Sequence, residues 1–555
     1  MSATAMGLPE IKRYTGVMDW LTTVDHKKIG LLYFWFTLTM GIVGGFLAGG
    51  IRLQLAMPGA VLETIHRAHL DGTAEPFALF GDTDRGLYNQ FMTMHASVMI
   101  FMVIIPSFAS FGNYLVPLMI GARDMAFPKM NGFAFWLLIP AALLMFGSFF
   151  VTGGAAQSGW TAYPPLSINS QGPGQDMWIL GVHIAGLSSI LGAINFLVTM
   201  TNMRAPGMTW LKMPLFCWAV FITSILQFAA TPVLASAVTM LLTDRNFGTT
   251  FLDASKGGDP VLYQHIFWFY SHPAVYIMVL PGFGAVTHII AAFSQKRVFG
   301  YLGMVLALAA IALLGFVVWA HHMFSVGMPT ALLAWFMYAS YGIGVPTGVK
   351  IFSWIATMWG GNIRFTTAMK FACGMVSLFV LGGFGGLILA TVPIDYSLHD
   401  TYYVVGHFHY TLVGGSVMVL FGMTYFWWPK MTGRMLNETV GSVVFWFMFL
   451  GVLITFATMH VSGIVGMPRR IPVYYEDFKF LNHITTFGYL LTIIGALIFF
   501  VQVILSMRKP MTASDDPWAI NDLQGGLEWA TSSPPPVYNF AKVPPIPIVS
   551  QMPEH

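Results

Sequence analysis

Residues 301–326 read YLGMVLALAAIALLGFVVWAHHMFSV. The stretch from Tyr301 to Ala320 carries no charged side chain, and about 20 apolar residues are enough for one membrane-spanning helix. It ends on two adjacent histidines, His321 and His322. An unpaired ionisable group in hydrocarbon is costly. The stretch therefore predicts a membrane helix whose end carries two side chains that need partners.

The rest of the chain has the same character. It has 555 residues, of which 56% are hydrophobic and only 9% charged, whereas a soluble domain has about 25% charged residues. Twelve segments are long and apolar enough to span a membrane: 29–51, 91–118, 134–153, 177–202, 212–241, 261–292, 298–326, 332–359, 366–391, 402–427, 440–463 and 482–506. Closed barrels need alternating strands instead. We predict an all-α membrane protein with twelve transmembrane helices in one bundle.

Charge sets the predicted orientation, because Lys and Arg in short loops stay in the cytoplasm. Loops on the N-terminal side hold sixteen of these residues and the opposite loops hold eight. Both termini are therefore expected in the cytoplasm, with 1–28 as an N-terminal segment, 29–506 as the membrane domain and 507–555 as a polar, Pro-rich tail. We expect the tail to lie against a second subunit. The net charge of +3 follows from this asymmetry and gives no reason to invoke nucleic acid.

Some features carry simple expectations. Cys217 and Cys373 both lie in predicted spans and are expected to be core residues, so no disulfide or thiolate metal site is predicted. The start of the chain lacks the apolar core of a cleavable signal peptide. Residues 58–88 form either a solvated loop or part of an outer docking face. Four histidines without ligand-spaced partners are expected to be packing or interface residues: His183, His265, His288 and His460.

Seven other histidines lie in or at the ends of predicted spans: His95, His272, His321, His322, His399, His407 and His409. Neutral imidazole is a strong ligand for copper and for haem iron. With a rise of about 1.5 Å per residue, all of them except His399, which lies in the loop before a span, fall in the outer half of the membrane. A common buried layer of metals is therefore possible.

Helix geometry divides these ligands between metals. Residues two apart on a helix differ by about 200°, so His407 and His409 cannot bind the same metal. His321 and His322 differ by only about 100°, so one metal can reach both, with His272 as a third ligand. Three imidazoles suit copper. Tyr276 stands one turn after His272 on the same face, where a phenol can supply a proton and an electron.

Three motifs carry a specific resemblance to a known family. They are His-Pro-x-Val-Tyr at 272–276, Trp-Ala-His-His at 319–322, and the run from His399-Asp400-Thr401-Tyr402-Tyr403 to His407-Phe408-His409-Tyr410. The chain closely resembles subunit I of the haem-copper cytochrome c oxidases. The likeness extends from Asp25-His26-Lys27-Lys28 to Leu527-Glu528-Trp529, which is nearly the whole chain.

The resemblance implies the metal ligands position by position. His95 and His409 would be axial ligands of a low-spin haem, and His407 the proximal ligand of a high-spin haem. Copper (CuB) facing that iron would be held by His272, His321 and His322, with Tyr276 covalently joined to His272. This assignment agrees with the angular argument.

Further site residues follow from the same resemblance. His399 and Asp400 match a magnesium site at the outer subunit interface. Residues around the haem propionates, where cations offset carboxylate charge, are matched by Trp160, Asp395, Arg469 and Arg470. Arg52 matches the arginine that contacts a formyl group on the low-spin haem, which favours haem A. Gln54 stands where relatives often carry a carboxylate for a calcium or sodium ion.

Two proton paths are implied, because hydrocarbon conducts no protons. Lys350, the only Lys or Arg deep within a predicted span, resembles the centre of the shorter path toward Tyr276, together with Thr347 and Thr287. A snorkelling structural lysine is the alternative. Asp124, with Asn113 and Asn131, resembles the start of the second path, although by itself it would be an ordinary loop acid.

The chain departs from most of the family at Ala274, where a glutamate usually ends the second path. Alanine cannot carry a proton. Tyr270, four residues earlier, can reach the same volume, and the chain resembles the branch in which a Tyr-Ser pair, here Tyr270-Ser271, replaces the glutamate. We expect proton pumping to be retained through this pair.

The leading hypothesis is a proton-pumping terminal oxidase of the respiratory chain that reduces O2 to water with electrons from cytochrome c. It would contain two haems, copper and magnesium, and would receive its electrons through the copper centre of subunit II. It would assemble with subunit II, subunit III and smaller subunits, within a larger respiratory assembly in some cases. The expected location is the inner membrane of a bacterium. A quinol oxidase is disfavoured because Gly41 to Ile51 contains no charge, and a nitric oxide reductase because it would lack the tyrosine at 276. A non-haem membrane ion transporter is the alternative from another class.

Overall fold

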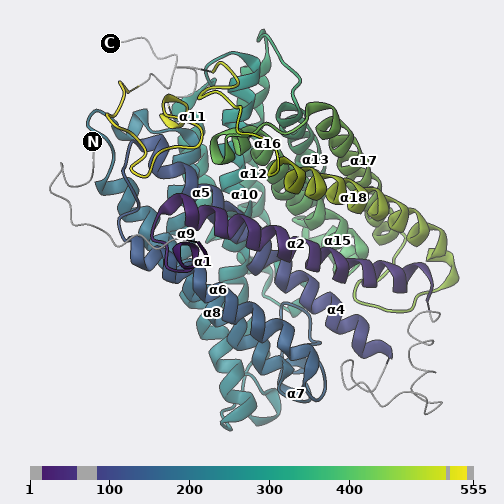
Figure 1. Cartoon of the computed structure of the whole chain (residues 1–555). Coiled ribbons are helices and arrows are strands. Elements are labelled where there is room, and N and C mark those ends of the chain that lie inside the picture. Colours follow the sequence, from purple (N-terminus) through teal and green to yellow (C-terminus); the bar gives the residue numbers. More distant parts are fainter. Residues whose placement is uncertain (1–15, 59–83, 521–525, 547–555) are drawn as a thin grey trace, which may run out of the picture.

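The computed structural model describes residues 16–58, 84–520 and 526–546. These residues form a bundle of long helices (Figure 1) and contain no β-strand beyond one isolated bridge between Thr401 and Pro468. The predicted all-α class is confirmed. Residues 1–15 and 59–83, which include most of the proposed 58–88 loop, lie outside the described residues.

Within the described ranges, eleven helical segments are long and apolar enough to cross a membrane. Eight of them each consist mainly of a single long α-helix: α2 (His26–Ala56), α6 (Pro128–Gly147), α8 (Gly174–Asn202), α9 (Leu215–Asn246), α10 (Pro260–Ser294), α13 (Thr367–Leu389), α17 (Glu438–Ile464) and α18 (Lys479–Ser506). Each matches a predicted span to within a few residues. The predicted span 332–359 is α12 (Thr330–Met358), a helix of spanning length that is not among the eleven. The count of twelve therefore stays a prediction.

Three spans are interrupted. Two of them contain a π-helix directly after α4 (Asp84–Val98) and after α15 (Tyr402–His409): η3 (Met99–Ile104), which leads into α5 (Ile105–Ile120), and η8 (Tyr410–Val417), which leads into α16 (Met418–Thr432). Such wide turns are rare and occur mostly at functional sites. The third span changes from α11 (Tyr301–Gly315) to the 3-10 segment η7 (Trp319–Val326). The predicted span 298–326 is present as Tyr301–Val326, and its last part is wound as a 3-10 helix instead of an α-helix.

Short helices connect these spans: α1 (Val17–Leu21), α7 (Leu166–Asn169), α14 (Val392–Leu398), η4 (Ser148–Phe150), η5 (Trp210–Lys212), η6 (Ala254–Lys256), η9 (Glu476–Phe478) and η11 (Glu528–Ala530). Among the spans, α10 is the most enclosed, with 89% of an 18-residue apolar stretch buried inside the protein. It packs against α9, η7, α12, α13 and α16. A residue on α10 is therefore surrounded by side chains from most of the bundle.

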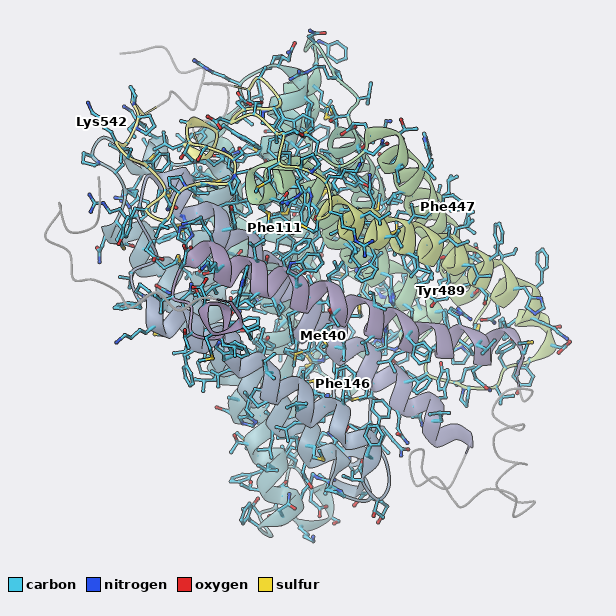
Figure 2. All side chains as sticks on the ribbon, viewed as in Figure 1. Met40, Phe111, Phe146, Phe447, Tyr489 and Lys542 are labelled. Atoms are coloured by element: carbon cyan, nitrogen blue, oxygen red, sulfur yellow. The ribbon has the colours of Figure 1, made fainter. Side chains whose placement is uncertain are left out.

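The surface of the bundle is apolar. Large side chains such as Phe46, Leu313 and Phe352 are more than 70% exposed, and Figure 2 shows such side chains projecting around the helices, with Phe447 near the outer edge. Water would penalise an apolar surface this extensive. The surface fits a hydrocarbon environment, as expected for a membrane protein.

The described part of the C-terminal tail lies against the chain itself. Its apolar residues Trp518, Ile520, Leu527 and Trp529 are buried. The Lys430 ammonium, also buried, donates to the carbonyl oxygens of Asp515 (3.1 Å), Thr531 (2.6 Å) and Ser532 (3.3 Å). The expectation that a second subunit provides the docking surface is wrong for these residues, because the tail carries its own apolar anchors.

The tail also meets the start of α2, where the Lys27 ammonium donates to the Val537 carbonyl (2.9 Å). The first and last described segments therefore lie on one face of the bundle. This agrees with termini on the same side of a membrane, while their cytoplasmic location stays a prediction.

Candidate metal centre and proton paths

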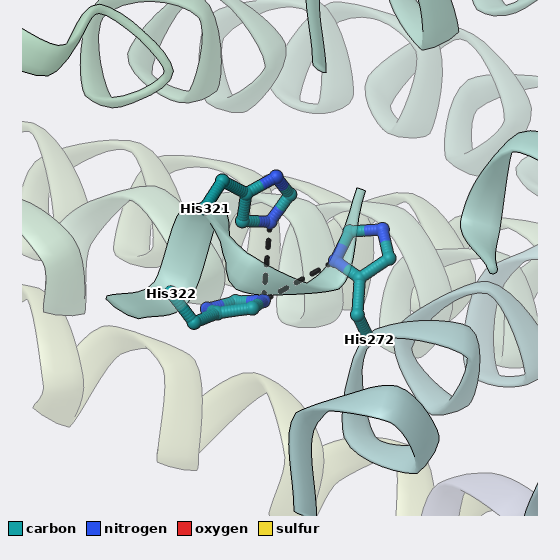
Figure 3. A group of neighbouring side chains, drawn as sticks. All are labelled: His272, His321 and His322. Atoms are coloured by element: carbon teal, nitrogen blue, oxygen red, sulfur yellow. Dashed lines mark hydrogen bonds between the residues drawn. The ribbon is translucent and has the colours of Figure 1, made fainter. Parts of the chain in front are cut away.

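Three histidines form a cluster in the interior of the bundle: His272 on α10, and His321 and His322 on η7 (Figure 3). One nitrogen from each ring lies within 4.8 Å of the others. The distance from His322 Nε2 is 3.2 Å both to His272 Nδ1 and to His321 Nε2. The histidine cluster is the only group of three or more potential metal ligands found in the described residues. Its spacing fits a single ion at the centre.

The protonation of His321 shows how its ring is oriented. Ser340 on α12 donates its hydroxyl hydrogen to the Phe336 carbonyl (2.5 Å). At the 2.8 Å contact with His321 Nδ1, the serine oxygen must therefore accept. Nδ1 carries the hydrogen, so the lone pair of Nε2 points into the cluster. A metal-binding histidine usually has such a second partner, which fixes its tautomer.

His272 and His322 are held by aromatic contacts. The His322 ring stacks on Trp268, with ring centroids 3.7 Å apart and planes 10° apart. The centroids of His272 and Tyr276 are 4.8 Å apart, and His272 Nε2 is buried with no hydrogen-bond partner in the part of the chain that the structure describes. The nitrogen that does not face the cluster is thus free, next to the phenol ring that the resemblance joins to His272.

His95 and His409 face each other from α4 and α15. Their ring centroids are 6.4 Å apart and their planes differ by 10°. Two imidazoles on opposite sides of one metal, each with a nitrogen about 2 Å from it, have centroids about 6 Å apart. Each Nδ1 donates to a backbone carbonyl, of Gly44 and of Val405, both at 2.9 Å. Both Nε2 lone pairs are therefore available, and the pair fits a six-coordinate haem iron.

His407 projects to another side of α15. Its Nδ1 donates to the Gly382 carbonyl on α13 (2.7 Å), which again leaves Nε2 as the available ligand atom. α13 approaches closely at Gly386, where a Cβ would lie 2.7 Å from His407 Cε1. The prediction that His407 and His409 serve different sites agrees with these different partners.

The residues predicted for magnesium and the propionates lie together near the ends of α14 and α17. His399 contacts Asp395 (Nδ1–Oδ2 3.2 Å) and Asp400 (Nε2–Oδ2 3.8 Å), and Arg469 Nη2 pairs with Asp400 Oδ1 (2.7 Å). Burial alone would raise the pKa of Asp400, but the charge of Arg469 holds that pKa below its usual value. Asp400 is thus kept ionised, as a cation ligand must be.

Arg52, which is buried, and Arg470, which is partly buried, are cations without a carboxylate partner among the described ion pairs. Burial and the neighbouring Arg469 lower the pKa of Arg470 to about 10. Arg52 Nη2 donates to Asn482 Oδ1 (2.8 Å), while its Nε has no partner among the described residues. Trp160 packs edge-on against Trp268, with centroids 6.0 Å apart. Unpaired buried cations are costly, so these side chains fit anionic or polar groups of a bound cofactor.

Lys350 lies inside the bundle on α12 and is 0% exposed. Its Nζ has no hydrogen-bond partner in the described residues and stands 5.6 Å from the centroid of the Trp354 ring. Trp354 Nε1 donates to Thr287 Oγ1 on α10 (2.8 Å). The structure therefore brings Lys350 close to Thr287, on the helix that carries Tyr276. Thr347 bonds only to the Ile343 carbonyl.

Asp124 lies in the loop between α5 and α6. Burial raises its pKa to about 7. Asn113 and Asn131 are each 1% exposed, and each has one side-chain atom without a hydrogen-bond partner within the described ranges. A cavity of about 50 Å³ adjoins Asn113 and is also lined by Ser188, which is room for a few water molecules.

Sequence reasoning missed part of this region. The polar residues Ser188 and Asn195 on α8 are buried, and Asn195 Oδ1 accepts from the Phe127 backbone N–H (2.9 Å), three residues after Asp124. The available signal was their spacing of seven residues within an apolar span, which places both on one helix face.

The remaining residues can be placed briefly. Tyr270 is 3% exposed. Ser271 is 0% exposed, and its hydroxyl has no hydrogen-bond partner among the residues that the structure describes. Cys217 is buried and Cys373 partly buried, both as free thiols. The four packing histidines all contact protein groups: His183 with Thr239, His265 with Trp319, His288 with Phe216 and His460 with Phe456.

Comparisons with known proteins now decide the family. The sequence profile described as cytochrome c and quinol oxidase polypeptide I matches residues 28–507. The chain belongs to this family. It is 46% identical to cytochrome c oxidase subunit 1 of Thermostichus vulcanus, over 98% of this chain and 94% of that one. It is also 46% identical to the subunit of the same name from Cereibacter sphaeroides, over 95% of each chain.

A solved haem-copper terminal oxidase dimer shares the fold. Its TM-score is 0.71 at 19% identity, over 90% of this chain and 85% of that chain. Membership in the oxidase family makes the chain the catalytic subunit of an oxidoreductase and implies that it holds haem and copper. The histidine cluster and the available nitrogens of His95, His407 and His409 fit these groups.

Proposed function

We propose that the chain is the catalytic subunit of a bacterial respiratory oxidase, in which electrons from cytochrome c reduce O2 to water. Each O2 takes up four electrons and four protons and yields two water molecules. The observation that carries the proposal is the histidine cluster. Its three ring nitrogens lie within 4.8 Å of one another, a spacing that suits one copper ion. A quinol oxidase of the same family is the alternative, and the uncharged stretch 41–51 of α2 argues against it.

The proposed ligands are those given by the motifs. His272, His321 and His322 would hold copper, His407 the high-spin haem, and His95 with His409 the low-spin haem. When bound, these groups supply the one-electron chemistry by which O2 is reduced. The chain's own part is to orient the rings. His95, His407 and His409 each donate to a backbone carbonyl and His321 donates to Ser340, so that one lone pair per ring is aimed at the metal. Aromatic contacts hold His272 and His322.

Tyr276 would supply a proton and an electron from its hydroxyl. The proposed bond between His272 and Tyr276 would replace one N–H and one ring C–H bond by an N–C bond. The two electrons and two protons released would go to O2, the substrate. The free His272 Nε2 and the 4.8 Å between ring centroids support this step.

Two separate proton routes follow from the buried polar groups. Lys350, Thr347 and Thr287 would lead toward Tyr276, since Lys350 approaches Thr287 through Trp354. Asp124, Asn113 and Asn131 would begin the second route, which the cavity beside Asn113 extends into the bundle. Tyr270 and Ser271 would complete it where Ala274 removes the carboxyl group. Pumping would then use the second route.

The remaining assignments are also part of the proposal. His399 and Asp400 would hold magnesium. Arg469, Arg470, Trp160 and Asp395 would surround the propionates, and Arg52 would contact a formyl group of haem A. Subunits II and III would complete the complex in the plasma membrane, with 29–506 as the membrane domain.

The test is a reduced-minus-oxidised spectrum combined with elemental analysis of the purified complex. We expect two haem irons per copy of this chain and one copper in addition to the copper centre of subunit II, and His321→Ala should lose that one copper. Extraction of the haem reports its type. A colourless preparation would favour the membrane ion transporter and refute the proposal. Activity with quinol but not with reduced cytochrome c would support the alternative donor.

The role of the Tyr-Ser pair has its own test. Tyr270→Phe removes one hydroxyl and leaves the ring, so the packing of α10 is kept. We expect slower proton uptake and fewer protons pumped per electron in vesicles containing the purified complex. An unchanged pumping stoichiometry would exclude this role for Tyr270.

A further inference from the structure

The C-terminal tail covers the loop that carries Asp124. Asn539 of the tail is 0% exposed, although it follows the polar and proline-rich residues 531–538. It lies between the start of α2 and the loop that carries Asp124. A buried amide in a terminal segment requires hydrogen-bond partners on the surface that it covers.

Asn539 bonds to both of these elements at once. Its Oδ1 accepts from the Lys27 ammonium (3.0 Å). Its Nδ2 donates to the carbonyl oxygens of Ala122 (2.9 Å) and Arg123 (3.4 Å), the two residues directly before Asp124. One side chain thus joins the first turn of α2 to the loop.

His26 completes the contact. Its Nδ1 is 2.7 Å from the Asn113 carbonyl oxygen, which can only accept, so Nδ1 carries the hydrogen. In the neutral ring Nε2 is then an acceptor for Asn539 Nδ2, at 2.9 Å. Through His26, the tail is connected to Asn113 as well, and Asn113 lines the cavity of the proposed second route.

The position of the Asp124 carboxylate depends on the same two elements. It accepts from its neighbour's backbone N–H, that of Met125 (2.7 Å), and it interacts with the backbone N–H of His26 at the start of α2. A helix N-terminus favours a negative charge. A shift of the loop relative to α2 would therefore move the carboxylate away from this partner.

We infer that Asn539 is a positioning residue for proton entry: it holds Asp124 against the start of α2. The tail would thereby keep the first group of the second proton route in place. The inference rests on the proposed role of Asp124. Asn539 does not carry the proton itself. It fixes the geometry of the group that does.

The test is the variant Asn539→Gly in the complete oxidase complex. The backbone φ of Asn539 is +67°, a conformation that glycine adopts without strain, so this change removes the amide and keeps the tail conformation. The matched control is Lys542→Ala, an exposed residue at the periphery of the same tail (Figure 2). Asp124→Asn is measured alone and in combination with Asn539→Gly.

Two rates are measured: proton uptake from a pH-indicator dye when the reduced enzyme reacts with O2, and reduction of the oxidised enzyme, which would draw on the route of Lys350. A misplaced reacting group costs up to about 100-fold in rate. We expect uptake to slow by about tenfold in Asn539→Gly, with reduction unchanged and Lys542→Ala normal. Added to Asp124→Asn, the change should cause no further loss.

The outcomes separate the two levels of inference. Normal uptake in Asn539→Gly, or an equal slowing of both rates, would overturn the role of Asn539 while Asp124→Asn remains slow. Normal uptake in Asp124→Asn would overturn the proposed route itself. If the glycine variant does not assemble, Thr531→Val removes the hydroxyl that donates to the Asn539 carbonyl (2.6 Å). It should slow uptake alone to a smaller extent, and normal uptake in it would count against the inference.

Discussion

Ser340 offers a direct test of how the proposed copper ligands are oriented. Its oxygen accepts the Nδ1–H of His321 (2.8 Å) and its own hydrogen goes to the Phe336 carbonyl. Ser340→Ala would leave the Nδ1–H of a buried ring without a partner, which costs about 1–3 kcal/mol. It would also free the ring to adopt the other tautomer, with a hydrogen on the nitrogen that faces the cluster.

The expected loss in copper affinity follows from these numbers. Removing the outer partner of a metal-binding histidine typically weakens binding by about 10–100-fold, and each tenfold corresponds to about 1.4 kcal/mol. The two estimates agree. We therefore expect Ser340→Ala to lose half of the copper bound by the histidine cluster at about 10–100-fold lower chelator concentration than the unchanged chain.

The assay is dialysis against a graded series of a copper chelator, followed by elemental analysis of copper per iron. The control is Ser462→Ala, which removes an equally buried serine that bonds only to a backbone carbonyl one turn earlier (3.0 Å). Copper retention in Ser340→Ala identical to that of the control would refute the assigned tautomer of His321.

Three further predictions concern other parts of the site. His95→Ala should remove one haem and lower the iron content from 2 to about 1 per copy of the chain, with the spectrum of the remaining haem retained; loss of both haems would contradict separate sites. Since burial raises the pKa of Asp124 to about 7, the folded protein binds more protons than the unfolded chain between about pH 4 and 7, so stability should fall as pH rises through this window. Asp124→Asn should reduce this loss of stability with pH, by about 2–4 kcal/mol at most, as measured from melting curves at pH 5 to 8. A dependence of stability on pH equal to that of the unchanged chain would argue against a buried acid. Gly386→Ala places a Cβ 2.7 Å from His407, which should cost about 1–3 kcal/mol and alter the high-spin haem spectrum, whereas an unaltered spectrum would show that the ring can move.

The spans were predictable because each lies in a long, nearly uncharged segment. α10, for example, runs from Pro260 to Ser294 against a prediction of 261–292. The same uniformity hid the internal breaks. In the apolar sequence around Phe316, nothing marks the change from α11 to η7, because the stacking of His322 on Trp268 is a tertiary contact. The π-helices are likewise absent from the hydropathy pattern.

The histidine cluster was predictable from spacing and from the motifs, and the structure brings its three rings together. The partners that orient the rings were not. Ser340 lies on a different helix from His321, and the carbonyl of Gly44 has no sequence signature at all. The proline content of the tail predicted an extended segment against another subunit. Trp518 and Trp529 are instead buried against the bundle, and they are the residues that indicated this packing.

The π-helix η3 lies between His95 and Asn113 on one continuous rod. A wide turn accommodates one more residue than an α-helical turn. If Met99–Ile104 were wound as a regular α-helix with no residue lost, everything beyond it would be rotated by about 100°. His95 would stay in place, while Asn113 would turn away from the cavity that it lines. The wide turn therefore sets the rotation of Asn113 about the helix axis relative to His95, the proposed iron ligand.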